Sequence, residues 1–373
     1  MKLVRVIVAD DSVVYRTQIK AALSRLSWVE VVGTAANGKI AIDLLEQTKA
    51  DLLTLDLEMP TMDGIQTLKE LSLKNISPKV LVFSSASKRG AEITFEALRL
   101  GAHDFIAKPG PSAPGAVASF ENRTDPSTLI LEMLEPKIKG LFPDVEFNAL
   151  ASQVKTEAKS GGYQKLDWEL FRPRILVIAS STGGPTVLEK IFQDLSAPVD
   201  CPILITQHMP PVFTATLAER IQKISGIPAR EGIHGEVLEK NRIYIAPGNY
   251  HMSLTGSKEN ATIVLDQGPL VNSVRPAADP MFESAARIFG SQCLGIVLTG
   301  MGADGRDGAV KVKEANGMII IQERESCIVF GMPGAVMDAQ AYDRMQTPDG
   351  IISSIQEKVA KSVRLKNVAS GGA

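Results

Sequence analysis

Two kinds of hydrophobic periodicity alternate along residues 4–109. Short apolar runs such as "VRVIVAD" are each followed by a longer stretch, such as "RTQIKAALSRL", in which apolar residues recur every three or four positions. The runs are typical of buried strands, and the longer stretches are typical of amphipathic helices. Their alternation predicts a parallel sheet that helices cover on both faces. The expected strands are residues 4–10, 29–35, 50–56, 79–86 and 104–109.

A second series of the same kind begins near residue 173. Helices are expected at residues 186–195 and 212–224, and an antiparallel hairpin at residues 250–256 and 261–267. The series predicts another doubly wound α/β domain, Rossmann-like in type. Its expected strands are residues 174–180, 201–207, 242–247, 293–300 and 317–322.

The segment between the two series differs in composition. It opens with "KPGPSAPGAVAS", which is typical of a linker, and ends with the polar stretch "ASQVKTEAKSGGYQK". Helical periodicity at residues 125–142 predicts one amphipathic helix between these stretches. We therefore expect a domain at residues 4–122, a linker with a helix at 123–171, a domain at 172–360 and a frayed tail at 361–373.

The composition agrees with two globular domains and excludes several classes of protein. The chain has 373 residues, of which 45% are hydrophobic and 22% charged. The net charge of −2 indicates no general nucleic-acid surface, and no apolar run reaches membrane-spanning length. Because the N-terminus also lacks a signal peptide, a cytoplasmic location is expected. The cysteines, expected to be core thiols, are Cys201, Cys293 and Cys327, and no histidine pair has metal-ligand spacing.

Acidic and polar residues stand at the carboxyl ends of the strands expected in the first domain. They are Asp10, Asp11, Asp56, Ser84 and Lys108. The carboxyl ends of a doubly wound parallel sheet line one crevice. Three carboxylates there favour a hard cation such as Mg²⁺, while a hydroxyl and an ammonium group beside them suit phosphoryl oxygens. The pattern predicts that an aspartyl phosphate forms with the help of Mg²⁺.

The motifs "VADDS", "LTLDLEMPTMDG", "VFSSAS" and "GAHDFIAKP" resemble the receiver domain of two-component response regulators. The resemblance implies a flavodoxin-like fold and phosphorylation at Asp56. It also implies that the three aspartates bind Mg²⁺ together with the backbone carbonyl of Glu58. The remaining implied roles are a switch hydroxyl, an aromatic switch residue and a phosphate partner, assigned to Ser84, Phe105 and Lys108.

Three residues with the chemistry of a nucleophile, a base and an orienting acid follow strands of the second domain. Ser181 follows the first strand, His208 the second, and Asp304 the strand "CLGIVL". If these strands share one parallel sheet, the side chains converge at one edge. The chain order of serine, histidine and aspartate differs from that of the α/β-hydrolases, and their G-x-S-x-G turn is missing.

The loop "ASSTGGP" has a second interpretation. Glycine-rich turns between a strand and a helix also bind phosphate. However, the loop fits neither G-x-G-x-x-G nor GxxxxGK[ST], and no lysine enters the following helix before Lys190. Nucleotide binding is therefore disfavoured, although the pattern alone leaves Ser180, Ser181 and Thr182 as candidate nucleophiles.

The motifs "ASSTGGP", "TQHMP", "IAPGNYHM", "RPAADPMFESAA" and "LTGMGADGRDG" are similar to those of the CheB family of protein-glutamate methylesterases. The resemblance implies that Ser181 is the nucleophile, His208 the base and Asp304 the orienting acid. We expect oxyanion donors among the backbone amides near Thr182 and Met301, because glycine turns expose N–H groups. Arg275 has two interpretations, contact with an acidic substrate surface or a structural salt bridge.

The function implied by the resemblance is a phosphorylation-activated esterase of bacterial chemotaxis. It would hydrolyse glutamate γ-methyl esters on methyl-accepting chemoreceptors, release methanol, and deamidate certain receptor glutamines. The histidine kinase CheA would donate the phosphoryl group, and the esterase domain would need no cofactor. The expected protein is a cytoplasmic monomer that binds no nucleic acid and is not inserted in a membrane. Its unphosphorylated receiver is expected to cover the active-site crevice.

Other classes of output domain fit the sequence less well. A DNA-binding response regulator needs a basic recognition helix, and the second domain lacks one. A degenerate esterase that only binds would have lost Ser181, His208 or Asp304, and all three are present. A nucleotide-binding switch remains an alternative for the glycine-rich loop.

Overall fold

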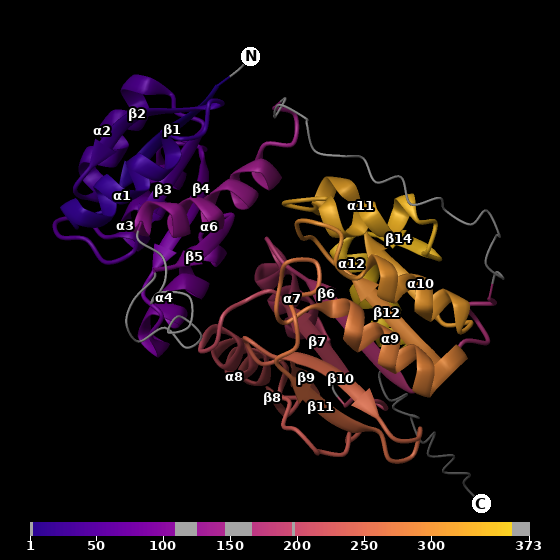
Figure 1. Ribbon diagram of the computed structural model, residues 1–373. Coiled ribbons are helices and arrows are strands. Elements are labelled where there is room, and N and C mark those ends of the chain that lie inside the picture. The colour runs from indigo at the N-terminus through magenta and orange to yellow at the C-terminus, as the bar shows by residue number, and fades with distance from the viewer. Residues whose placement is uncertain (1–2, 109–124, 146–165, 196–197, 360–373) are drawn as a thin grey trace, which may run out of the picture.

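The structure is a computed structural model that describes residues 3–108, 125–145, 166–195 and 198–359. Two α/β domains follow one another along the chain, each built on its own parallel sheet (Figure 1). The expected tail at 361–373 and residues 146–165 of the expected linker lie outside the described residues.

The first domain has the predicted parallel sheet. Its strand order is β2-β1-β3-β4-β5, which is the doubly wound order of flavodoxin-like folds. The strands are β1 (Val4–Ala9), β2 (Val29–Ala35), β3 (Leu52–Asp56), β4 (Lys79–Ser84) and β5 (Asp104–Ala107). The helices that alternate with them are α1 (Val13–Leu23), α2 (Gly38–Thr48), α3 (Gly64–Leu73) and α4 (Lys88–Arg99). All five strand predictions are confirmed.

Helix α6 (Pro126–Leu141) completes the cover of this sheet. The helix itself was predicted, but its assignment to a linker at 123–171 needs correction. Its buried side chains at Ile130, Leu134, Ile138 and Leu141 join one apolar cluster with Val4, Val6 and Val8 of β1. Their spacing puts one face of the helix against the sheet, next to α1. Without α6 that face of β1 would be exposed, so the first domain extends beyond residue 122.

The second domain contains a sheet of seven strands that are all parallel. Their order is β14-β13-β12-β6-β7-β9-β8. The strands are β6 (Ile175–Ser180), β7 (Ile203–Gln207), β8 (Ala229–Glu231), β9 (Ile243–Ile245), β12 (Cys293–Val297), β13 (Met318–Gln322) and β14 (Arg344–Gln346). The five predicted strands are confirmed, whereas the three-residue edge strands β8 and β14 were not predicted. The predicted hairpin is also present, as the antiparallel pair β10 (His251–Thr255) and β11 (Thr262–Asp266).

Helices cover both faces of this sheet (Figure 1). Helices α7 (Gly184–Asp194), α8 (Phe213–Ser225) and α12 (Pro348–Val359) pack on one face. Helices α9 (Ala278–Phe289), α10 (Arg306–Glu314) and α11 (Gly331–Asp338) pack on the other face, together with the hairpin. Two short 3₁₀ helices are η1 (Gly290–Gln292) and η2 (Arg324–Ser326). Cys201 and Cys293 are buried as expected, and Cys327 is only partly buried.

The strand order of the second sheet decides where a crevice forms. The chain leaves β6 toward β7 on one side and later returns to β12 on the other side of β6. A ligand crevice in such sheets lies at the carboxyl ends of the strands where the order reverses. The carboxyl ends of β12, β6 and β7 are therefore the expected position of a site. In the described part of the chain, no helix is long and apolar enough to cross a membrane.

The imidazole of His103 makes the stability of the first domain depend on pH. Its Nδ1 accepts a hydrogen bond from the Val80 amide at 3.2 Å. Burial, aided by the charge of Lys79, lowers the pKa of His103 to about 4. Between about pH 6.5 and 4 the unfolded chain therefore binds a proton that the folded chain does not, so stability falls as the pH falls.

We expect proton uptake by His103 in the unfolded chain to lower the free energy of unfolding by up to about 3 kcal/mol between about pH 6.5 and 4. Urea unfolding followed at several pH values should give a steeper loss for the wild type than for His103→Gln. Parallel curves for the two proteins would contradict the assignment to His103.

Candidate catalytic and phosphoryl-acceptor sites

Three neighbouring strand ends bring the predicted catalytic residues to one edge of the second sheet. Strand β6 pairs with β12 on one side and with β7 on the other. The register pairs Ser180 with Gln207, so the residues that follow, Ser181 and His208, are also neighbours. Asp304 reaches the same edge from the loop between β12 and α10. The convergence expected from the strand-end positions is present in the structure.

Asp304 is held by four hydrogen bonds. Its Oδ2 lies 2.7 Å from His208 Nε2 and accepts the Ala278 amide at 2.6 Å. Its Oδ1 accepts the Asp279 amide at 3.2 Å and the Asn272 side chain at 3.0 Å. Burial disfavours the charge, but the hydrogen bond from His208 and the backbone amides outweigh burial and lower the pKa of Asp304. The carboxylate is therefore ionised and oriented toward His208.

The structure distinguishes among the three hydroxyls of the glycine-rich loop. The fully buried Ser180 donates its hydroxyl hydrogen to Gln207 Oε1 at 2.6 Å. The Thr182 hydroxyl donates to Asp104 Oδ2 of the first domain. The Ser181 hydroxyl takes part in no hydrogen bond with any other described residue. Of the three candidates that the sequence pattern left open, Ser181 is the one whose hydroxyl has no such partner.

Close backbone packing fixes the position of Ser181. Its carbonyl accepts the Gln207 side-chain amide at 2.9 Å, and its amide donates to the Thr299 carbonyl at 3.0 Å. A Cβ at Gly300 would lie 2.8 Å from the Cβ of Ser181, closer than real Cβ atoms approach other heavy atoms. The loop after β12 can therefore lie against the nucleophile loop only because residue 300 is glycine.

The backbone near Thr182 and Met301 has the properties expected of oxyanion donors. Neither amide donates a hydrogen bond to an acceptor among the described residues. Each is followed by a glycine with positive φ, Gly183 at 77° and Gly302 at 83°. Such turns leave N–H groups exposed to a ligand. The assignment of these two amides stays a prediction.

Arg275 donates hydrogen bonds within a loop, and it forms no salt bridge, one of its two interpretations, with any residue that the structure describes. Its Nε and Nη2 donate to Asn249 Oδ1 at 3.1 and 2.7 Å. Its Nη1 donates to the carbonyls of Gln267 and Gly268 at 2.9 and 2.7 Å. Most of its donors are therefore used within the domain. Contact of Arg275 with an acidic substrate stays a prediction.

The acidic residues of the first domain gather as the sequence predicts. Ligand oxygens of Asp10, Asp11 and Asp56 all lie within 4.8 Å of one another. Lys108 Nζ lies 2.9 Å from Asp10 Oδ2 and 2.8 Å from Asp56 Oδ2. Burial and the charge of Asp10 raise the pKa of Asp56, against the effect of Lys108. Oxygen ligands at this spacing fit Mg²⁺, which would relieve the repulsion between the carboxylates. The carbonyl of Glu58 as a further ligand stays a prediction.

The predicted switch residues connect this cluster to helix α4 and to the second domain. The buried Ser84 hydroxyl donates to the Gly90 carbonyl of α4 at 3.1 Å. The Phe105 ring is stacked on Phe213 at the start of α8, with 4.5 Å between ring centroids. Phe105 therefore belongs to the boundary between the domains as well as to the first domain.

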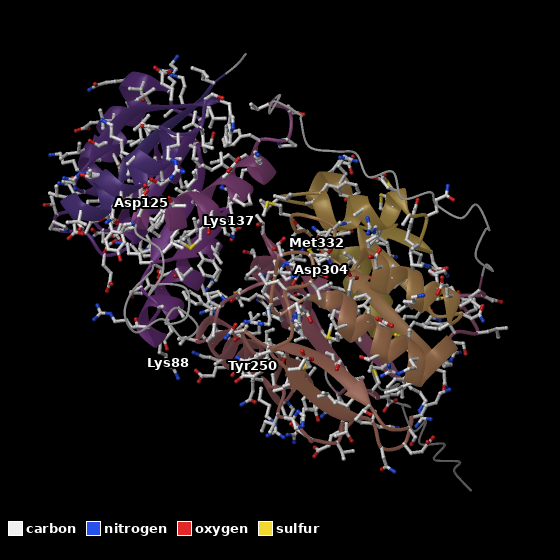
Figure 2. The ribbon with its side chains drawn as sticks, in the orientation of Figure 1. Lys88, Asp125, Lys137, Tyr250, Asp304 and Met332 are labelled. Carbon is white, nitrogen blue, oxygen red and sulfur yellow. The ribbon has the colours of Figure 1, made fainter. Side chains whose placement is uncertain are left out.

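Sequence reasoning missed the polar contact at this boundary. The Asp104 carboxylate on β5 accepts the hydroxyl of Thr182 and lies 2.6 Å from Lys137 Nζ of α6. Figure 2 shows Lys137 on the side of α6 that faces the second domain. A carbon added at Gly140 of α6 would lie 3.3 Å from Met301 Cγ. The first domain thus contacts the loop that carries Ser181 and the loop after β12. In the sequence, an acid at the start of a strand, such as Asp104, does not indicate such a contact.

Comparison with known proteins agrees with both domains. The CheB methylesterase family matches residues 176–355, and the response regulator receiver domain matches residues 6–114. The protein-glutamate methylesterase/protein-glutamine glutaminase of Trichodesmium erythraeum is 37% identical over 344 residues, which cover 91% of this chain and 95% of the relative. The protein-glutamate methylesterase/protein-glutamine glutaminase 2 of Caulobacter vibrioides is 39% identical over 336 residues, covering 90% and 93%.

Among solved structures, the catalytic domain of Thermotoga maritima CheB methylesterase is 39% identical and covers 50% of this chain and 98% of that chain, with a TM-score of 0.48. The sequence matches and the two sheets define the class of the protein, a response regulator whose receiver domain is joined to a methylesterase domain. The chain belongs to the CheB family of protein-glutamate methylesterases/protein-glutamine glutaminases, a family of hydrolases. The family predicted from the sequence motifs is confirmed.

We expect Gly300→Ala to lower hydrolase activity strongly and to destabilise the second domain by about 1–3 kcal/mol. The new methyl group would overlap Met332 Sδ and lie 2.8 Å from Ser181 Cβ, so both side chains would have to move. Gly334→Ala is the matched control, because the new Cβ meets only the Phe330 ring at 3.2 Å. Esterase assays and thermal unfolding of both variants test this. Wild-type activity in Gly300→Ala would contradict the close packing.

Proposed function

We propose that the chain is a phosphorylation-regulated protein-glutamate methylesterase of bacterial chemotaxis. It hydrolyses glutamate γ-methyl esters on chemoreceptors, releases methanol, deamidates certain receptor glutamines, and acts in the cytoplasm. The observation that carries the proposal is the 2.7 Å hydrogen bond of His208 with the buried Asp304, at the strand end next to Ser181, whose hydroxyl has no hydrogen-bond partner among the described residues. This arrangement supplies the groups that acyl transfer requires.

The hydrogen bond between His208 and the ionised Asp304 suggests a role for each ring nitrogen. Nε2 donates to Asp304 Oδ2, so the neutral imidazole carries its hydrogen there, and Nδ1 is the basic nitrogen. In the proposed reaction Nδ1 takes the proton of Ser181 as the hydroxyl oxygen attacks the ester carbonyl. The charge of Asp304 stabilises the imidazolium that forms.

The acyl-enzyme forms and breaks in two balanced steps. The tetrahedral intermediate collapses when the bond to the methoxy oxygen breaks, and the imidazolium gives its proton to the leaving methanol. Water then attacks the acyl carbon while His208 takes one of its protons. The bond to Ser181 Oγ breaks, the imidazolium returns that proton to Oγ, and the receptor is released with a glutamate γ-carboxyl group. With a glutamine substrate the leaving group is ammonia instead of methanol. The amides of Thr182 and Met301 are the proposed donors to the oxyanion.

In the receiver, we propose that Asp56 accepts a phosphoryl group. Asp10, Asp11 and Asp56 would hold Mg²⁺, with the Glu58 carbonyl as a further ligand, and the ion would neutralise charge during transfer. Lys108 lies close enough to contact a phosphoryl oxygen on Asp56. The proposed phosphodonor is a chemotaxis histidine kinase of the CheA type. The esterase reaction itself is proposed to need no cofactor.

The domain contacts support inhibition of the esterase by the unphosphorylated receiver. Asp104 binds the hydroxyl next to Ser181, Phe105 is stacked on Phe213, and α6 lies against Met301. A receptor segment could not reach the nucleophile loop while these contacts hold. Phosphorylation at Asp56 would reposition Ser84 and Phe105 and weaken the contacts that close the site.

The catalytic assignment is tested by methanol release from methylated receptor. We expect Ser181→Ala to lose at least about 10⁴-fold in kcat, because no other hydroxyl of the loop is free to attack. Ser180→Ala is the matched control, since that hydroxyl is bound to Gln207. It should retain most of the rate. Equal rates for Ser181→Ala and the wild type would refute the mechanism.

The inhibitory contact is tested by measuring the esterase rate without a phosphodonor. We expect Phe105→Ala to raise this basal rate about 3–10-fold, because a stacked aromatic pair contributes about 0.5–1.5 kcal/mol. Lys88→Ala, which removes an exposed ion pair with Glu219 of α8, should change the rate less than twofold or so. A basal rate in Phe105→Ala at or below that of the wild type would argue against inhibition through this contact.

A further inference from the structure

The side-chain amide of Asn272 lies between two acidic side chains. Its Nδ2 is 2.7 Å from Asp279 Oδ2 and 3.0 Å from Asp304 Oδ1. An amide nitrogen carries two hydrogens, so Asn272 can donate to both carboxylates at once. Asp279 and Asp304 are buried, whereas Asn272 itself lies at the surface. Asn272 thus connects the catalytic acid with a second carboxylate to which sequence reasoning gave no role.

The N-termini of two helices point at the same carboxylates. The first amides of α9, those of Ala278 and Asp279, donate to Asp304 at 2.6 and 3.2 Å. The Gly308 amide in the first turn of α10 donates to Asp279 Oδ1 at 2.7 Å. Helix N-termini stabilise negative charge through their free N–H groups and dipoles. This arrangement permits two buried acids to lie side by side.

The loop that carries Asn272 is a tight turn aimed at this pair. Asn272 and Ser273 both have positive φ, 51° and 66°, a conformation that asparagine tolerates better than most residues. Val271 and Val274 on either side exchange backbone hydrogen bonds at 3.3 and 3.0 Å. The turn therefore holds the Asn272 side chain toward the carboxylates at the edge of the catalytic crevice.

We propose that Asn272 and Asp279 are positioning residues of the esterase site, which keep the Asp304 carboxylate in the orientation that His208 requires. The inference rests on the proposed function and assigns these residues no contact with substrate. Asp304 Oδ2 is the oxygen that faces His208, and Asn272 binds the other oxygen. If Asn272 is lost, Oδ1 retains one amide donor at 3.2 Å and faces Asp279 with no donor between the two charges.

The acidity of Asp279 agrees with this geometry. Burial, followed by the charge of Asp304, raises the pKa of Asp279 to about 6. The other ionisable groups near this pair in the described residues are His208, Arg306 and Asp307. Two carboxylates in partly dry surroundings repel strongly, so the amide placed between them affects the energy of both.

The test compares kcat and KM for methanol release by the full-length chain and its variants. We expect Asn272→Ala to lower kcat by between about 10-fold and 100-fold with little change in KM, because misplaced catalytic groups slow the chemical step. Asn316→Ala is the matched control. Asn316 also has a positive φ, 59°. It precedes β13 and so lies at the amino ends of the strands, whereas the candidate site lies at their carboxyl ends. Its kcat should stay within about twofold of the wild type, since surface changes away from a site have small effects.

Asn272→Asp gives a second readout that a purely structural role would not produce. The shape is retained and aspartate accepts the same backbone conformation, but a third carboxylate replaces the shared donor. We expect the ratio of the Asn272→Asp kcat to the Asn272→Ala kcat to fall as the pH rises from about 5 to 8. The introduced aspartate ionises over this range, and its charge repels Asp304. Because the shape is kept, this variant decides the question if Asn272→Ala does not fold.

The outcomes separate this inference from the proposed function. If Ser181→Ala loses methanol release while Asn272→Ala keeps the kcat of the wild type, the positioning role is wrong and the esterase mechanism stands. An equal loss of kcat in Asn272→Ala and Asn316→Ala, or a pH profile of Asn272→Asp that matches the wild type, also overturns the inference. If Ser181→Ala keeps the full rate, the proposed function itself fails.

Discussion

The buried negative charge of Asp304 constrains much of the catalytic domain. A carboxylate with 2% of its surface exposed is stable only when hydrogen-bond donors replace water. His208, two amides of α9 and the Asn272 side chain supply these donors. Meeting this requirement fixes the start of α9, the turn around Asn272 and the imidazole ring relative to β12. The contacts that orient His208, the proposed general base, are thus also the contacts that keep a buried charge stable.

The boundary between the domains combines apolar packing with polar contacts to the candidate catalytic loop. One cluster of buried apolar side chains runs from the receiver into the catalytic domain and includes Phe95, Phe105 and Phe213. Asp104 adds a hydrogen bond to Thr182, the residue after the candidate nucleophile. A change at the receiver sheet can reach the catalytic loop through a few direct contacts, because β5 carries both Asp104 and Phe105.

Local periodicity predicted most strands of both sheets, but in the second domain it predicted only helices α7 and α8, not α9 or α12. The strands of four or more residues in both parallel sheets were expected, and so was the three-residue β9, while the three-residue edge strands β8 and β14 were not. Helix α6 was predicted as a helix but assigned to the wrong part of the molecule. Its periodicity indicates a buried face at Ile130 and Leu134 without indicating which surface buries it. Only the uncovered side of β1 decides that.

The sequence by itself determined the type of fold and the family, and it singled out the residues proposed to carry the chemistry. Ser181, His208 and Asp304 follow strands of the second sheet, and Asp56 ends a strand of the first. The carboxyl ends of parallel strands lie at one edge, so such positions come together where the strand order makes the strands neighbours. Tertiary structure alone decided which hydroxyl is uncommitted, since Gln207 and Asp104 approach from other elements to bind Ser180 and Thr182. It also decided the partners of Asp304. Hydrogen bonds between residues far apart in the chain depend on packing distances that no local pattern records.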